Sequence, residues 1–270
     1  MPELPEVENT RRNLVRAGLP GCTITDANIT WANTVKKPSA AELAAGLRDR
    51  TIQDVQRRGK YLILPLSGGG PAAFIVHLGM TGRLRVQPQS QEPDPMTRHF
   101  FPLDDGRELR FVDGRKFGKL WLVDSPNEVL PTMSPEPFDD EFTVETLAES
   151  FAGRKAALKA LLLEQSVACG LGNLYADESL FLAGLHPERP ASELSVEEIA
   201  RLRQAIIDSL TAAYGVYDRA RDQDWPDPPT ALTTWSHPRD IKAGCPNCGT
   251  NMTAIRVRAR STYFCAECQV

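Results

Sequence analysis

The chain has 270 residues, a formal net charge of -4 and a sequence pI near 5.7, and 41% of its residues are hydrophobic. This length is enough to bury a sizeable core, and it predicts two domains of ordinary size with a small appendage. No apolar run is long enough to cross a bilayer, and the acidic, proline-containing N-terminus excludes a signal peptide, so we expect a cytoplasmic protein. The net negative charge disfavours nucleic-acid binding over the whole protein surface. Local basic clusters decide that question, and they occur at residues 57–60, 110–119 and 256–260.

The chain begins MPELPEVE. Removal of Met1 would leave Pro2 as a free secondary amine, and an α-amino group titrates at about 7.7–8.0, so a useful fraction is unprotonated at neutral pH. Such an amine can attack an aldehyde-like carbon and form an iminium ion, which is an electron sink for elimination. Glu3, beside the amine, could move the proton.

A structural interpretation of the same segment remains open. Pro5 fits the first turn of a helix predicted over residues 6–17 and ended by Gly18. Glu6 and Glu8 suit the positive end of that helix, whereas Pro2 and Glu3 precede it.

Residues 23–123 have mostly strand-like patterns, separated by turn residues such as Gly68–Gly70 and Asp105-Gly106. This spacing favours an antiparallel sandwich. One helix interrupts it, opened by a capping box of Ser39 and Glu42. The predicted strands cover residues 51–55, 60–64, 73–76, 108–112 and 120–123.

The segment 125–137 contains four prolines and predicts a linker, after which the pattern becomes helical. We expect helices over 154–165 and 173–183, and another opened by Ser195 and Glu198. Gly170 and Gly172, with Asn173 as N-cap, could aim backbone N–H groups at a phosphate, or they could form a plain joint between helices. Residues 218–238 are polar and not periodic, which predicts a loop.

Four cysteines form two C-x2-C pairs, Cys245 with Cys248 and Cys265 with Cys268. This spacing predicts one structural Zn²⁺ with four thiolate ligands and no open position. Between the pairs, residues 255–258 and 262–264 read as two short strands with Arg260 near their tip. That arginine could contact a phosphate or could be an exposed residue without a role. The other cysteines, Cys22 and Cys169, are interpreted as buried small residues.

Taken in order, six motifs resemble the formamidopyrimidine-DNA glycosylase family, which includes endonuclease VIII. They are the N-terminal segment 2–8, Arg58–Leu62, His77–Gly82, Asp113–Gly118, Gly170–Glu178 and the cysteine hairpin. The resemblance spans nearly the whole chain. It implies an α+β fold with an N-terminal antiparallel β-sandwich flanked by helices (1–130), a helical helix-two-turn-helix domain with a lesion loop (131–238) and a zinc-finger β-hairpin (239–270).

The resemblance also implies the activity: excision of oxidised purines from duplex DNA, followed by strand cleavage at the abasic (AP) site by β,δ-elimination. Pro2 would form the Schiff base at C1′, and Glu3 would protonate the sugar ring oxygen. The implied catalytic residues are Pro2, Glu3, Lys60 and Arg260. The implied substrate and DNA contacts are Glu6, Met80, His99, Arg115, Lys116, Phe117 and Asn173.

Among these residues, Met80, Arg115 and Phe117 match those that fill the space left by an extruded base. Lys60, Asn173 and Arg260 match phosphate contacts. The implied partner is damaged double-stranded DNA, the implied cofactor one zinc ion, and the implied state a monomer in the bacterial cytoplasm or nucleoid.

Some positions depart from the family pattern. Gly114 and Lys116 replace the more usual proline and arginine, Cys169 replaces alanine, and the segment from Trp225 to Trp235 does not align with the lesion-capping loop. Two alternatives therefore stay open: an endonuclease VIII-like preference for oxidised pyrimidines, and a non-catalytic protein of the same fold that binds damaged DNA.

Overall fold

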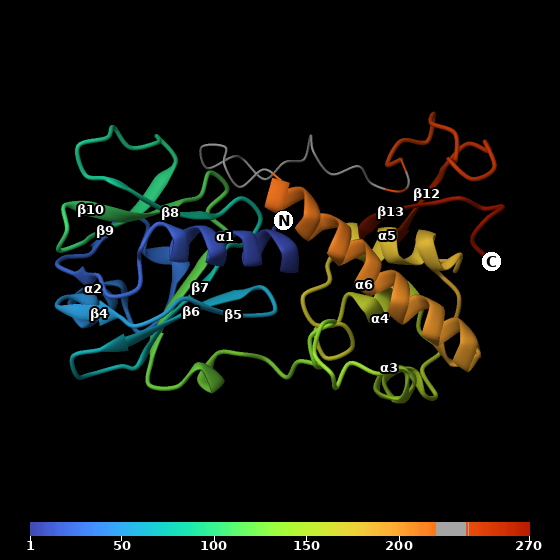
Figure 1. Ribbon diagram of the computed structural model, residues 1–270, viewed down its shortest axis with the longest axis horizontal. Coiled ribbons are helices and arrows are strands. Elements are labelled where there is room, and N and C mark those ends of the chain that lie inside the picture. The colour runs from blue at the N-terminus through green and yellow to red at the C-terminus, as the bar shows by residue number, and fades with distance from the viewer. Residues whose placement is uncertain (220–235, 237) are drawn as a thin grey trace. The chain divides into compact units, whose positions relative to one another are not determined.

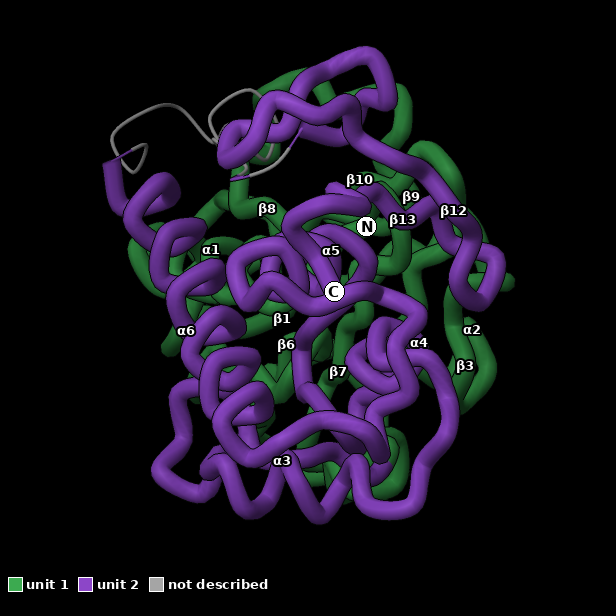
Figure 2. The backbone as a smooth tube through the Cα atoms, turned by 90° about the vertical axis from the view of Figure 1, so that its right-hand side faces the viewer, with its two compact units in different colours: residues 1–131 green, residues 132–270 purple. Residues whose placement is uncertain are grey.

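The computed structural model describes residues 1–219, 236 and 238–270, which form two compact units, 1–131 and 132–270 (Figure 2). The segment Trp225 to Trp235, and with it most of the expected loop 218–238, lies outside the described residues. The proposed boundary between a helical domain and a separate zinc domain at residue 239 stays a prediction. No helix in the described part of the chain has both the length and the apolar character needed to cross a membrane.

Unit 1 begins with helix α1, Leu4–Arg16, which starts two residues earlier than predicted. Glu3 is its N-cap, and the Glu6 carboxylate accepts a hydrogen bond from the Glu3 backbone N–H at 2.8 Å. This bond satisfies a donor that the first helical turn leaves without a partner. Pro5 lies in that first turn, as expected, and Gly18 follows the helix with a φ of 68°.

Unit 1 also contains two β-sheets (Figure 1). Every strand pair is antiparallel except β11 with β3. The larger sheet has the order β1 (Thr23–Ile24), β4 (Arg50–Ile52), β6 (Tyr61–Ser67), β7 (Ala73–His77), β11 (Lys119–Val123) and β3 (Val35–Lys37), and β5 (Gln56–Arg58) pairs with β6. The smaller sheet has the order β2 (Asn28–Ile29), β9 (Thr97–Pro102), β10 (Arg107–Val112) and β8 (Arg83–Pro88).

The larger of two apolar clusters in unit 1 draws residues from both sheets, which confirms the predicted sandwich. Phe74 on β7 meets Phe101 on β9 edge to face, with ring centroids 5.3 Å apart, and both rings are fully buried. Helix α2, Ala40–Leu47, begins with the predicted Ser39 and Glu42 capping box. Short 3-10 turns lie at Ala32–Thr34 and Pro126–Glu128.

Unit 2 contains four α-helices and a β-hairpin among its described residues. The helices are α3 (Val144–Phe151), α4 (Leu158–Leu162), α5 (Asn173–Ala183) and α6 (Val196–Arg219), with a 3-10 turn at Ala191–Glu193, and the hairpin strands are β12 (Thr253–Val257) and β13 (Arg260–Phe264). Helix α5 packs along α6, and Leu180, Leu202 and Ile206 are fully buried in the shared core. The predicted pairing of Ser195 with Glu198 opens α6.

Two helix predictions in unit 2 were wrong in detail, and one helix was missed. Helix α4 covers five residues instead of 154–165, because the backbone of residues 154–158 bonds instead to residues 189–192. Helix α3 was not predicted, although Thr143 and Thr146 cap it reciprocally. Gly172, not Asn173, is the N-cap of α5, and Asn173 is the first helical residue.

Candidate functional site

The N-terminus of α1 places Pro2 and Glu3 directly before a fixed helical turn. Pro2 is partly buried and Glu3 is 1% exposed. The bond from the Glu3 N–H to Glu6 holds the backbone at this position. Pro2 and Glu3, the two predicted catalytic residues of this segment, therefore lie on an ordered part of the chain.

Lys60 lies beside Gly59 in the tight turn between β5 and β6, and its side chain is 7% exposed. An ion pair of 3.0 Å between Arg57 on β5 and Glu8 on α1 links this hairpin to the N-terminal helix. Glu8 also pairs with Arg11 at 2.8 Å and Arg12 at 2.9 Å. Burial acts to raise the pKa of Glu8, but its bonds to these three arginines outweigh burial and lower the pKa to about 2.

Two loops that carry predicted DNA contacts are joined by one buried carboxylate. Asp113 is fully buried, and it accepts a hydrogen bond from the Thr81 hydroxyl at 2.6 Å and from the Gly118 N–H at 2.7 Å. The Thr81 hydroxyl in turn accepts from the Arg115 N–H at 3.2 Å. The loops also touch directly, because a Cβ on Gly79 would lie 2.5 Å from the Phe117 carbonyl. Loop 78–82 and loop 113–118 thus form one ordered unit.

This pair of loops carries Met80, Arg115 and Phe117. Met80 is partly exposed, and Phe117 is 51% exposed although it is a large apolar side chain. The Arg115 guanidinium lies 5.3 Å from the centre of the Phe117 ring. Lys116 between them has a φ of 61°, and its ammonium lies 3.6 Å from the centre of the Trp31 ring. The arrangement is suited to inserting side chains into a base stack.

His99 has a different environment from the other predicted DNA contacts. Its ring is fully buried, stacks on Phe111 with centroids 5.6 Å apart, and lies 2.7 Å from the Thr34 hydroxyl. Burial is the main cause that lowers its pKa to about 4. A direct contact between His99 and DNA stays a prediction, and this interior position does not support it.

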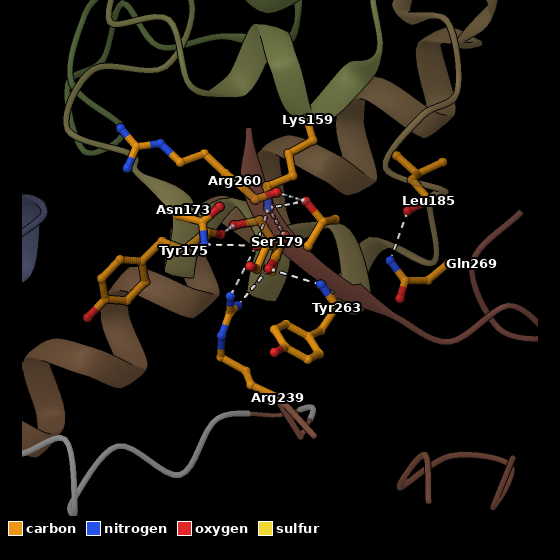
Figure 3. A network of polar contacts seen from close by, with 12 residues as sticks. Lys159, Asn173, Tyr175, Ser179, Leu185, Arg239, Arg260, Tyr263 and Gln269 are labelled. Atoms are coloured by element: carbon orange, nitrogen blue, oxygen red, sulfur yellow. Dashed lines mark hydrogen bonds and ion pairs between the residues drawn. The ribbon is translucent and has the colours of Figure 1, made fainter. Parts of the chain in front are cut away.

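In unit 2, Asn173 on α5 contacts Ser261, the residue that follows Arg260 in strand β13. The Asn173 amide donates to the Ser261 carbonyl at 3.0 Å, and Arg260 is the exposed residue that begins β13. In Figure 3 the Arg260 guanidinium extends away from the labelled polar network. The Gly170 N–H, which could have faced an anion, bonds to the Gln165 side chain at 3.0 Å.

The four predicted metal ligands lie together. Their sulfur atoms are all within 4.8 Å of one another, with Cys245 to Cys268 at 3.9 Å and Cys248 to Cys265 at 3.5 Å. A tetrahedral zinc ion with Zn–S bonds of about 2.3 Å separates its sulfurs by about 3.8 Å, so the cluster fits one Zn²⁺ with no open position. Cys22 and Cys169 are buried elsewhere, as expected.

Sequence reasoning missed the polar residues that hold these groups in place. Asp113 lay within a quoted motif but was given no role, and Asp177, which is fully buried on α5, was also missed. Residue type gave little signal, because Asp177 stands directly before Glu178 and Ser179 in the predicted helix, and the need of a buried carboxylate for partners follows only once its burial is known.

Comparisons with known proteins agree along the whole chain. The formamidopyrimidine-DNA glycosylase N-terminal domain matches residues 1–120, and the H2TH domain of the same glycosylase matches residues 133–219. The formamidopyrimidine-DNA glycosylases of Acaryochloris marina and Desulfitobacterium hafniense are 36% and 39% identical to the chain over all of its length, and the chain covers 99% and 100% of them.

Solved structures give the same result. The MutM (Fpg) protein of Thermus thermophilus matches with a TM-score of 0.85 at 36% identity, covering 99% of this chain and 98% of that one. A Lactococcus lactis Fpg mutant in complex with DNA containing Fapy-dG matches with a TM-score of 0.88 at 31% identity, covering 99% of each chain. The chain belongs to the formamidopyrimidine-DNA glycosylase family.

Proposed function

We propose that this protein is a base-excision DNA glycosylase that removes oxidised purines and then cuts the strand as an AP lyase. The full-length match to formamidopyrimidine-DNA glycosylases carries the proposal. It is supported by the N-terminal Pro2 and buried Glu3 at the start of α1. The bacterial origin of these relatives favours the cytoplasm or nucleoid as its place of action.

The chemistry follows from a free amine on Pro2 after Met1 is removed. The nitrogen lone pair attacks C1′ of the damaged nucleotide, and the bond from C1′ to the base breaks with its electrons leaving on the base. The N–H proton of Pro2 passes to the departing base, Glu3 donates a proton to the sugar ring oxygen, and the bond from C1′ to that oxygen breaks as the nitrogen lone pair forms the C=N bond of the Schiff base. This iminium accepts the electrons of the two eliminations that release the 3′ and then the 5′ phosphate.

Basic and polar side chains hold the DNA. Lys60, Asn173 and Arg260 bind phosphates around the flipped nucleotide, and Glu6 supports the helix end that carries Glu3. Met80, Arg115 and Phe117 fill the space left by the extruded base, which otherwise costs about a few kcal/mol in lost stacking. Their placement on two joined loops supports this role.

Borohydride reduction tests the lyase step. With Met1 confirmed removed, the protein is expected to form a covalent adduct through Pro2 with duplex DNA containing an abasic site, because borohydride reduces the Schiff base. A matched protein that retains Met1 should bind the DNA but form no adduct. If the processed protein bound abasic DNA tightly without adduct or strand scission, the non-catalytic alternative would replace the proposal.

Base preference requires its own experiment. Excision is compared on duplexes containing 8-oxoguanine, formamidopyrimidine and thymine glycol. We expect both purine lesions to be removed faster. Activity on thymine glycol alone would favour the endonuclease VIII-like alternative.

A further inference from the structure

A buried ionic network lies beneath Arg260, at the junction of α4, α5 and the zinc hairpin. Asp177 on α5 and Lys159 on α4 are both fully buried, with 2.6 Å between the carboxylate and the ammonium. The Arg239 guanidinium lies 2.6 Å from the other Asp177 oxygen, and the Tyr263 N–H donates to that oxygen at 3.3 Å. Figure 3 shows the side chains of this network converging from separate elements.

The same two cations also reach the hairpin directly. Lys159 donates to the Thr262 hydroxyl at 2.6 Å and to the Ser261 carbonyl at 3.3 Å. Arg239 donates to the Ser261 carbonyl at 3.4 Å, and its guanidinium lies 4.9 Å from the centre of the Tyr263 ring. With the bond from Asn173, donors from three separate elements therefore meet on the one carbonyl that follows Arg260.

The energetics of this arrangement favour a role in positioning. A buried ion pair often adds little net stability compared with apolar residues of the same size, because desolvation opposes the attraction. Removing one partner is costly, however, and buried polar groups can fix one register of packing. Here one carboxylate faces two cations. The network therefore ties the start of β13 to α5 and leaves excess positive charge near Arg260.

We propose that Asp177, Lys159 and Arg239 are positioning residues that fix Ser261, so that Arg260 and Asn173 meet the same stretch of DNA backbone. This inference rests on the proposed function and extends it to residues that touch no substrate. Arg239 is the best residue of the network to substitute, because its side chain is 19% exposed, whereas Asp177 and Lys159 are fully buried and their loss would disturb folding more.

The experiment measures how salt weakens binding to a duplex with an uncleavable abasic analogue, using the full-length, zinc-loaded protein. Each phosphate contact contributes about 0.9 to the slope of log affinity against log salt. Arg260→Ala should lower the slope by about 0.9, as expected for one lost contact. Arg239→Ala should lower it by a similar amount, and the double variant should match Arg260→Ala alone. Arg201→Ala, which removes an exposed charge on α6, serves as the control and should leave the slope unchanged.

Three results would overturn the inference. An unchanged slope for Arg239→Ala would mean that the network does not place Arg260. A double variant that loses about 1.8 would mean that Arg239 makes a phosphate contact of its own. An unchanged slope for Arg260→Ala would mean that Arg260 makes no phosphate contact for the network to position. If Arg239→Ala loses zinc, Arg239→Gln replaces it with the same expectations, and borohydride trapping on the wild-type protein tests the proposed function independently.

Discussion

The hydroxyl of Thr81 offers a direct test of the two joined loops, because it bridges Asp113 in one direction and Arg115 in the other. Thr81→Val keeps the shape of the side chain and removes both hydrogen bonds. The bond to the Asp113 carboxylate is charge-assisted and part-buried, and such bonds contribute about 1.5–3 kcal/mol. The bond from Arg115 is exposed and water replaces it, so we expect the free energy of unfolding to fall by about 2 kcal/mol.

The same loss should affect excision more than strand cleavage. In the variant the two loops are less ordered, and ordering them before they enter the base stack adds up to about 2 kcal/mol to the activation free energy. Single-turnover excision of 8-oxoguanine should therefore fall by up to about 30-fold. Cleavage at a preformed abasic site requires no base to be extruded, so its rate should change by less than about threefold.

Urea unfolding and the two single-turnover assays measure these effects. Thr25→Val is a matched control in the same unit, since the Thr25 hydroxyl makes an exposed bond to the Pro102 carbonyl. A Thr81→Val protein that is less stable but excises 8-oxoguanine at the wild-type rate would refute this role of the loops. An equal fall in excision and in abasic-site cleavage would refute it too, because the loops would then have no separate part in base extrusion.

Three further predictions concern other parts of the chain. Cys245→Ser should release the zinc ion, reducing metal content measured by a colorimetric chelator from about one per chain to near zero, whereas Cys22→Ser should keep it, because Cys22 lies away from the cluster. Burial, aided by the charges of Lys119 and Lys60, lowers the pKa of His77 from 6.5 to about 4. The stability that depends on neutral His77 is therefore complete above pH 6.5 and is lost as the pH falls toward 4, by up to about 1.4 kcal/mol per pH unit. Over this range the free energy of unfolding of His77→Asn, measured with urea, should fall less steeply than that of the wild type. Trp31→Leu removes the ring beneath Lys116 and should slow excision a few-fold, as about 1 kcal/mol of cation–π energy implies, while Trp31→Phe retains most of the rate; equal rates for the two variants would contradict this role.

Local patterns predicted the fold well where local interactions determine it. The Ser39 and Glu42 capping box, the strand-like segment 108–112 within β10 and the C-x2-C spacing inside each cysteine pair depend on neighbours within a few residues. Residues 154–158 had a helical pattern, but their backbone groups bond to residues more than 30 positions later, so a longer helix does not form. Sequence patterns alone do not show such long-range pairing.

In the candidate site, too, some residues could be predicted from local sequence and others could not. The groups expected to meet DNA, such as Pro2 and Arg260, lie in recognisable motifs, because their chemistry depends on residue type. The groups that hold them, Asp113 and Asp177, have no motif of their own, because their role depends on which distant donors the fold brings to them. Each carboxylate is fully buried and joins segments that are separate in the chain, Thr81 with Gly118 in one unit and Lys159 with Arg239 in the other. In both units, then, exposed side chains that would enter or grip the DNA stand on loops or strands fixed by a buried acid. An isosteric change at a partner of either acid should therefore alter DNA engagement without touching a residue that contacts DNA.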